Sequence, residues 1–322
     1  MRRLWDDFAA EGARPVSGRR RIRPQDLLGD IADLPPEWDD GMRAMAQPYV
    51  EQPVIVAIDN VSDYFHIGTD KEFWDLRYDF PNIAPPWPNA WYEYAAPPYL
   101  LSTVHGRVDR DPDDPTRYGT HVLSVKRTDD DGTFQGWECM AYYIAEYHND
   151  LYAVPWRSVW KVTPDGQMDM TLPHPDGQPG PALIHKKIDL TTPDEAVQAM
   201  TPQLMYPMWL ANSFAHCKNV ESERVTPPRK LAAKHAKRGR PLHDFHVLKI
   251  EPMVRRVEAS GAMAPAGERT QQGLHIRRGE FRDYRERGLF GRHKGVFWFD
   301  AHVRGSGPRK VDKTYDVRAP KP

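Results

Sequence analysis

Histidine and arginine recur at short spacing between Leu274 and Gly305, in the segment LHIRRGEFRDYRERGLFGRHKGVFWFDAHVRG. It contains an H-x-x-R-G motif that begins at His275 and an H-x-R-G motif that begins at His302. Arginine presents a planar pair of donors to a phosphate, and glycine lets backbone N–H groups approach an anion. These residue types therefore predict an anion-binding site that suits a phosphate or a phosphodiester.

Two kinds of chemistry are compatible with this segment and with the basic stretch before it. Binding of a nucleic acid predicts phosphate contacts from Arg238, Arg240, Arg278, Arg282, Lys294 and Arg304. Catalysis predicts His275 and His302 as the general acid and base of a metal-independent phosphodiester cleavage. In a third alternative the basic residues pair with Glu280, Asp283 or Asp300 on a solvated strand face.

The segment is expected to form two strands joined by a loop that contains Gly288, Gly291 and Gly295. Side chains alternate between the two faces of a strand. On the first strand, Arg278 and Arg282 therefore share one face, and His275 lies on the other. We expect the basic residues to be split between two faces of the paired strands.

A second basic motif precedes this segment, at Lys237-Arg238-Gly239-Arg240-Pro241. Arg-Gly-Arg-Pro resembles the core of an AT-hook, a family in which the extended tetrapeptide lies in the minor groove of A·T-rich DNA. The negative potential of that narrow groove attracts arginine. A helix that ends at Gly239, just before Pro241, explains the same residues. Both interpretations are compatible with the sequence.

The net charge of −1 conceals two oppositely charged parts of the chain. Residues 1–217 carry 19 Lys and Arg against 33 Asp and Glu, whereas residues 218–322 carry 25 against 12. The first part is therefore at −14 and the second at +13. Such an asymmetry indicates either that the basic part binds a polyanion or that the two parts contact each other, including in self-association.

Apolar content of 40% indicates a globular protein with a core, and the ten Trp make the chain unusually rich in large rings. No apolar run approaches the ~20 residues needed to span a bilayer, so we expect no membrane partner. Cys139 and Cys217 provide neither a disulfide framework nor a metal-binding cluster. The common nucleotide, hydrolase and zinc motifs are absent from the sequence. We expect a cytoplasmic protein with no cofactor and no metal.

The apolar pattern predicts an α+β fold with three parts. Residues 1–50 are expected to form a helical lead-in, residues 51–217 an acidic body with an antiparallel-rich sheet, and residues 218–322 a basic region that contains strands. The run PVIVAID at 53–59 predicts a strand that is covered on both faces. It ends at Asp59, whose carboxylate is either a metal or catalytic ligand or part of a turn.

Turn signals predict further elements of the body. Asp129 to Gly132 and Pro164 to Gly166 each lie between β-rich runs and predict two hairpins. A capped helix is expected from Thr192 to about His216, broken or kinked at Pro202 and Pro207.

Two other stretches differ in composition from the body. Residues 229–237 predict a helix that is basic on several sides, followed by a strand at 246–250. The aromatic stretch 73–101 is compatible either with a stacking platform for bases or sugars or with a segment that fills the core.

The segment from Arg278 to Gly305 resembles a group of uncharacterised proteins from bacteriophages, prophages and plasmids. Their C-termini contain R-G-x-F/W-R, a glycine-rich spacer, an aromatic pair and H-x-R-G. The matching residues here are Arg278, Gly279, Phe281, Arg282, Leu289, Phe290, Gly291, Gly295, Phe297, Trp298, His302, Arg304 and Gly305. Glu280 stands where a histidine is expected in that group, which argues against a two-histidine mechanism. The resemblance implies a mobile-element origin and a cytoplasmic host setting, but no activity.

We therefore expect an accessory protein of a phage or mobile element that binds DNA or RNA through its basic C-terminal region. One alternative is a metal-independent nuclease or toxin with His275 and His302 in its site. Another is a structural or protein-interaction protein whose oppositely charged parts neutralise each other.

Overall fold

A computed structural model describes residues 3–15, 21, 23–24, 53–62, 80–95, 117–147, 149–169, 182–185, 194–251, 275–277, 279–300 and 302–304. The chain divides into two compact units. The first comprises Met1–His216 and Val220–Lys249, and the second comprises Cys217–Asn219 and Ile250–Pro322. Most of the predicted helical lead-in after residue 15 lies outside the described residues.

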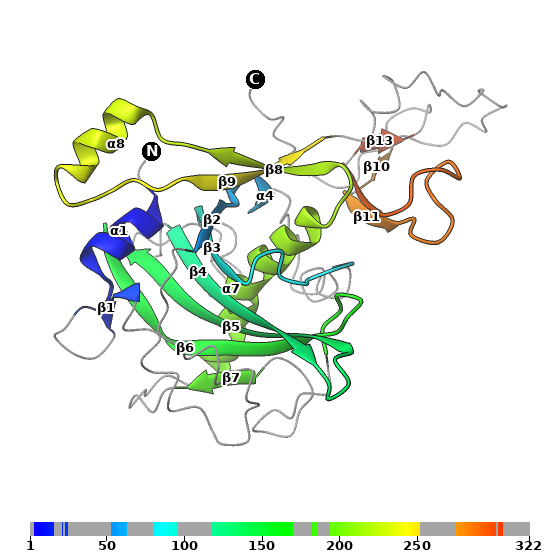
Figure 1. Cartoon of the computed structure of the whole chain (residues 1–322), viewed down its shortest axis with the longest axis horizontal. Coiled ribbons are helices and arrows are strands. Elements are labelled where there is room, and N and C mark those ends of the chain that lie inside the picture. The colour runs from blue at the N-terminus through cyan, green and yellow to red at the C-terminus, as the bar shows by residue number, and fades with distance from the viewer. Residues whose placement is uncertain are drawn as a thin grey trace. The chain divides into compact units, whose positions relative to one another are not determined.

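A mixed sheet of nine described strands forms the first unit (Figure 1). The strands are β1 (Arg14–Pro15), β2 (Val54–Ala57), β3 (Asn89–Ala95), β4 (Arg117–Thr128), β5 (Phe134–Tyr147), β6 (Asp150–Val162), β7 (Ala182–His185), β8 (Val220–Val225) and β9 (Phe245–Ile250). Their order is β1-β6-β5-β4-β3-β2-β9-β8, and β7 also pairs with β6. The α+β class is confirmed.

The sheet is mixed, which corrects the expectation of an antiparallel-rich one. The strands β3 to β7 are joined by antiparallel pairings, and the turn at Asp129–Gly132 connects β4 to β5 as predicted. Among the described residues, the turn at Pro164–Gly166 is spanned by a single bridge, between Val162 and Met168. Parallel pairings join β2 to β3, β2 to β9, and β1 to β6. These parallel partners lie far apart in the sequence, so no local turn signal marks them.

Four helices accompany the described sheet: α1 (Leu4–Glu11), α4 (Asp59–Ser62), α7 (Asp194–Ala215) and α8 (Arg229–Ala236). The predicted long helix is confirmed as α7, which is continuous through Pro202 and Pro207, where the sequence predicts a break or a kink. Its second half is buried between Met205 and Phe214. That apolar burial stabilises the helix enough to offset the hydrogen bonds that the prolines remove.

The strand β2 is buried on both faces, as its β-branched sequence predicts. Asp59 and Asn60, which begin α4 one residue after β2, tie neighbouring strand ends together. Asp59 Oδ1 accepts a hydrogen bond from the Ala95 backbone N–H at 2.8 Å, and Asn60 Nδ2 donates to the Leu248 carbonyl at 2.6 Å. The Asp59 carboxylate therefore has a structural role in this arrangement.

Aromatic rings from distant parts of the chain form the core around β3. Trp91 and Tyr92 are adjacent and fully buried, and their side chains point to opposite faces of the sheet. On one face, Trp5 and Phe8 of α1 pack against Trp91 with ring centroids 5.1 and 5.6 Å away. On the other face, the Tyr92 hydroxyl bonds Asn212 of α7 at 2.6 Å. The described part of the aromatic stretch therefore fills the core.

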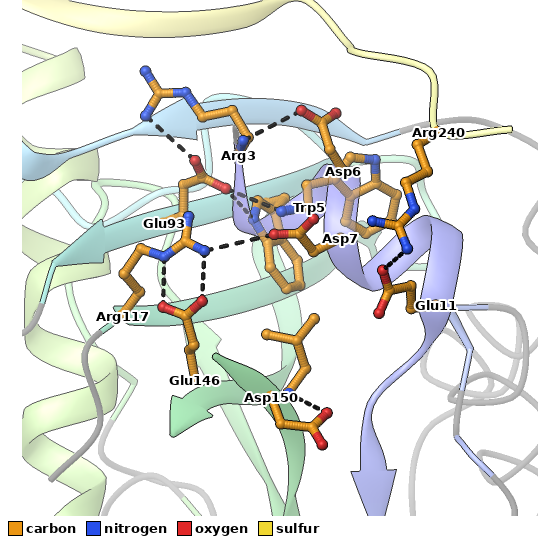
Figure 2. Close-up of polar contacts among 12 residues, drawn as sticks. Arg3, Trp5, Asp6, Asp7, Glu11, Glu93, Arg117, Glu146, Asp150 and Arg240 are labelled. Atoms are coloured by element: carbon orange, nitrogen blue, oxygen red, sulfur yellow. Dashed lines mark hydrogen bonds and ion pairs between the residues drawn. The ribbon is translucent and has the colours of Figure 1, made fainter. Parts of the chain in front are cut away.

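A buried carboxylate fixes α1 on the sheet (Figure 2). Glu93 is 4% exposed, and it accepts hydrogen bonds from the Trp5 backbone N–H at 3.2 Å and from Trp91 Nε1 at 3.0 Å. Arg3 lies 3.3 Å from its other oxygen. Burial raises the pKa of the Glu93 carboxyl, and Arg3 and the hydrogen bonds partly oppose this.

His121 on β4 should make folding depend on pH. Burial lowers its pKa to about 4, while the unfolded chain should titrate at about 6.5. As pH falls from about 6.5 to about 4, His121 is protonated in the unfolded chain but stays neutral in the folded protein. The free energy of unfolding therefore decreases. The free energy of unfolding should therefore fall by about 3 kcal/mol more in the wild type than in His121→Gln between pH 7 and pH 4.

Urea denaturation of both proteins at several pH values measures this difference. His121→Gln is the control for the wild type, because it lacks this imidazole and retains every other titratable group. A difference that is constant with pH would show that His121 is already accessible to protons in the folded state.

Candidate nucleic-acid interface

The segment from β8 to β9 forms a basic arm, defined here as residues 226–244, with α8 at its centre (Figure 1). None of the eight residues of α8 is buried. Between residues 229 and 240 there are six basic residues and no acidic one. They are Arg229, Lys230, Lys234, Lys237, Arg238 and Arg240. The predicted helix that is basic on several sides is confirmed, and core packing does not explain its sequence.

Three of these residues form a stripe along the helix. Lys230, Lys234 and Lys237 are spaced at i, i+4 and i+7, which places them on the same side of a helix. All three are exposed. The half-buried positions of the helix are Ala232 and His235, which belong to another side. The lysine stripe is therefore turned toward solvent.

The RGRP motif forms the end of α8. Gly239 has a φ of 70°, and its N–H donates to the Ala236 carbonyl at 3.0 Å. The Arg238 N–H donates to the His235 carbonyl at 2.9 Å. Gly239 therefore ends the helix in a left-handed conformation, as the helix-end alternative predicts, and the tetrapeptide is not extended in this structure.

The last part of the arm, residues 240–244 just before β9, is held by α1. Arg240 forms an ion pair with Glu11 at 2.5 Å (Figure 2). His243 contacts Asp6 Oδ1 through its backbone N–H at 3.1 Å and through Nδ1 at 2.7 Å. Asp6 is only 2% exposed, so this contact is shielded from water. Arg238 is exposed and available to a ligand, whereas Arg240 is engaged by α1.

The predicted strand pairing in the second unit is confirmed. There, β11 (Glu280–Asp283) pairs with β12 (Val296–Phe299), and β10 (His275–Arg277) pairs with β13 (His302–Arg304), both antiparallel. The same number of residues separates His275 from Glu280 as separates Phe299 from Arg304. One register therefore runs through both pairings, which form two separate two-stranded sheets. Together these four strands are termed the hairpin.

This register shows which of the predicted site residues lie opposite each other on paired strands. His275 is opposite Arg304 and Arg277 is opposite His302, so His275 and His302 are diagonal neighbours. Arg282 is at the alternate set of positions, opposite Phe297. His275 and Arg282 therefore lie at alternate positions, as strand alternation predicts, and Arg278 lies outside the described residues. The catalytic role of the two histidines stays a prediction.

Arg282 is engaged within its own strand. Its Nε donates to Glu280 Oε1 at 2.6 Å, and its guanidinium lies 4.4 Å from the centre of the Phe299 ring. This pairing is the one that the solvated-face alternative predicts. Lys294, in contrast, is exposed in the loop between β11 and β12.

Phe290 in that loop was not predicted as a site residue. It is 63% exposed, more than any other large hydrophobic side chain among the described residues. Its φ is 54°, a left-handed conformation that costs a residue with a side chain ~1–2 kcal/mol. Its signal in the sequence is Phe-Gly at the middle of a hairpin loop, where Asn-Gly is the usual pair.

Neither cysteine is suited to nucleophilic catalysis. Burial and the nearby Glu138 raise the pKa of the Cys139 thiol well above its usual range. Burial raises the pKa of Cys217 to about 12. The neighbouring His216 directs Nε2 to the Ala84 carbonyl at 2.9 Å. Both thiols are therefore protonated at neutral pH and lack the thiolate that such chemistry needs.

No family model, curated protein or solved structure matches the chain. The resemblance to mobile-element proteins therefore stays a prediction. Within the described part of the chain, no helix is both long enough and apolar enough to cross a membrane. Among the same residues, no three His, Cys, Asp or Glu side chains gather as a possible metal site.

The two thiols should be protected in the folded protein. Cys139 and Cys217 are both buried and protonated, so a disulfide reagent such as DTNB should react slowly with native protein and should titrate both thiols in denaturant. Absorbance at the wavelength of the released thiolate measures both rates. Rapid reaction of either cysteine without denaturant would contradict the protection described above.

Proposed function

We propose that this protein binds nucleic acid through contacts to the phosphate backbone, and that α8 is the main contact. One observation carries the proposal: a helix with no buried residue lies in a segment with six basic residues and no acidic one. An exposed helix of this composition contributes little to the core, and its charge suits a polyanion.

The geometry of α8 fits a phosphate backbone. Lys230 and Lys237 are separated by about 10 Å of helix rise, so the lysine stripe extends past several phosphates of one strand. Ala233 lies beside the stripe, three residues after Lys230 and four before Lys237, and its small side chain lets this side of the helix approach a ligand closely. Lysine contacts a phosphate as a point charge and carries no base preference. The proposed binding is therefore independent of sequence.

Acidic residues of the same chain neutralise little of the positive charge of residues 229–240. Of the six basic residues, Arg240 pairs with an acidic residue, Glu11. Among the described residues, the other five form no ion pair. The exposed Lys294 adds a further basic position in the second unit. The resemblance of residues 278–305 to proteins of phages and plasmids supports an accessory role in a mobile element.

A salt titration of binding tests this proposal. Log affinity for duplex DNA should fall linearly with log salt, because each neutralised phosphate releases counterions. Lys230→Ala with Lys234→Ala should weaken binding and should reduce the slope by about 2, since each lost phosphate contact removes roughly 0.9. Alanine favours helix, so α8 should persist. Fluorescence anisotropy between 50 and 200 mM salt, with duplex DNA and duplex RNA, measures both effects.

The matched control removes two exposed lysines outside the arm, Lys126 of β4 and Lys249 of β9. Lys126→Ala with Lys249→Ala changes the net charge equally and should leave the slope almost unchanged. Equal losses in the two double variants would assign binding to net charge and not to α8. Wild-type protein that binds neither polymer at low salt would rule the function out.

A further inference from the structure

The loop between β11 and β12 closes with a tight two-residue turn. The Arg292 N–H donates to the Leu289 carbonyl at 3.1 Å, across Phe290 and Gly291. The φ values of these two central residues are 54° and 71°. Positive φ at both positions is the signature of a type I′ turn, which favours Asn, Asp or Gly at its first central position.

Phenylalanine at this position serves neither the turn nor the core. Its backbone is in a conformation that asparagine adopts more readily. The small apolar cluster of the hairpin is formed by Leu289 and Phe297, with Tyr284 and Phe299 packed against it in part, and does not include Phe290. A strained, exposed aromatic residue is the kind of feature that marks a functional position.

Basic residues lie on both sides of Phe290 in the sequence of the loop. From Tyr284 to Gly295 the loop carries four Lys and Arg and one acidic residue, Glu286. Arg287, Arg292 and Lys294 are all exposed. The loop is also held in shape by its own backbone, since the Leu289 N–H donates to the His293 carbonyl at 2.7 Å and the Gly288 N–H to the Tyr284 carbonyl at 3.0 Å. The aromatic ring is therefore presented on a preformed, positively charged loop.

We propose that Phe290 stacks on an unpaired base of single-stranded nucleic acid, while Arg287, Arg292 and Lys294 contact the adjacent phosphates. This inference rests on the proposed function and adds a substrate class to it. Stacking of a base on an exposed aromatic ring, combined with nearby cations on the backbone, is how proteins bind single strands without sequence preference. In a duplex both faces of each base are occupied, so Phe290 should add little to duplex binding.

The surroundings of Phe290 favour a nucleic acid over a lipid surface. Its apolar neighbour Leu289 is only 7% exposed, so a bilayer would receive a single apolar side chain from this turn. Peripheral membrane segments need a larger apolar face to bind. One ring beside several cations matches the repeating unit of a single strand, in which each base is joined to a phosphate.

The test combines two substitutions with two measurements. Phe290→Asn should weaken binding of a single-stranded homopolymer such as dT12 on the order of tenfold, the size expected for one stacked base. The same variant should be more resistant to urea than the wild type, because asparagine suits the turn. Phe290→Trp should bind dT12 at least as well as the wild type. Loss of affinity together with a gain in stability cannot arise from unfolding.

Duplex DNA and lipid vesicles complete the test. If Phe290→Asn binds dT12 as tightly as the wild type, while duplex binding keeps its salt dependence, the stacking proposal is overturned and the proposed function stands. If the wild type binds neither dT12 nor duplex at low salt, both fail. A variant that loses binding to phosphatidylserine vesicles but keeps its affinity for dT12 would identify the loop as a membrane contact and would also overturn the proposal.

Discussion

The Glu93 carboxylate is the contact on which the first unit depends, because it joins α1 to the sheet inside the core. It receives a backbone N–H from α1 and the indole N–H of Trp91. With α1 fixed in this way, its Asp6 contacts His243 and its Glu11 contacts Arg240, both in the last part of the arm before β9. A buried acceptor on β3 thereby helps to position an exposed basic helix.

The chain has two basic segments, the arm (residues 226–244) and the hairpin. In each of them, a structural support holds exposed contact residues in place. In the arm, the supports are the paired strands β8 and β9 and the contacts of α1. In the hairpin, they are the continuous register and the hydrogen bonds of the loop. Among the described residues, the exposed large hydrophobic side chains are Leu231 and Phe290, one in each segment. Preformed surfaces lose less conformational entropy when they bind a ligand.

Local signals in the sequence predicted the hairpins, because Asp-Gly turns and β-branched runs act over a few residues. They also predicted that α8 is exposed. One of the alternatives from the sequence, pairing of the basic residues with Glu280, Asp283 or Asp300, describes Arg282, which bonds Glu280. The parallel pairing of β2 with β9 could not be predicted, since residues near 56 and 246 meet only in the folded chain. The exposure of Phe290 depends on the turn type, which follows from backbone angles that the residue types alone did not specify.

The contact between Asp6 and His243 spans 237 positions of the chain. A ribosome adds about 5–20 residues per second, so roughly 10–50 s pass between the synthesis of Asp6 and the synthesis of His243. During that interval the apolar side of α1, with Leu4, Trp5 and Phe8, has only part of its final binding surface available. We therefore expect the arm to be anchored late in synthesis, and the nascent chain to be most prone to aggregation before residue 243 has emerged.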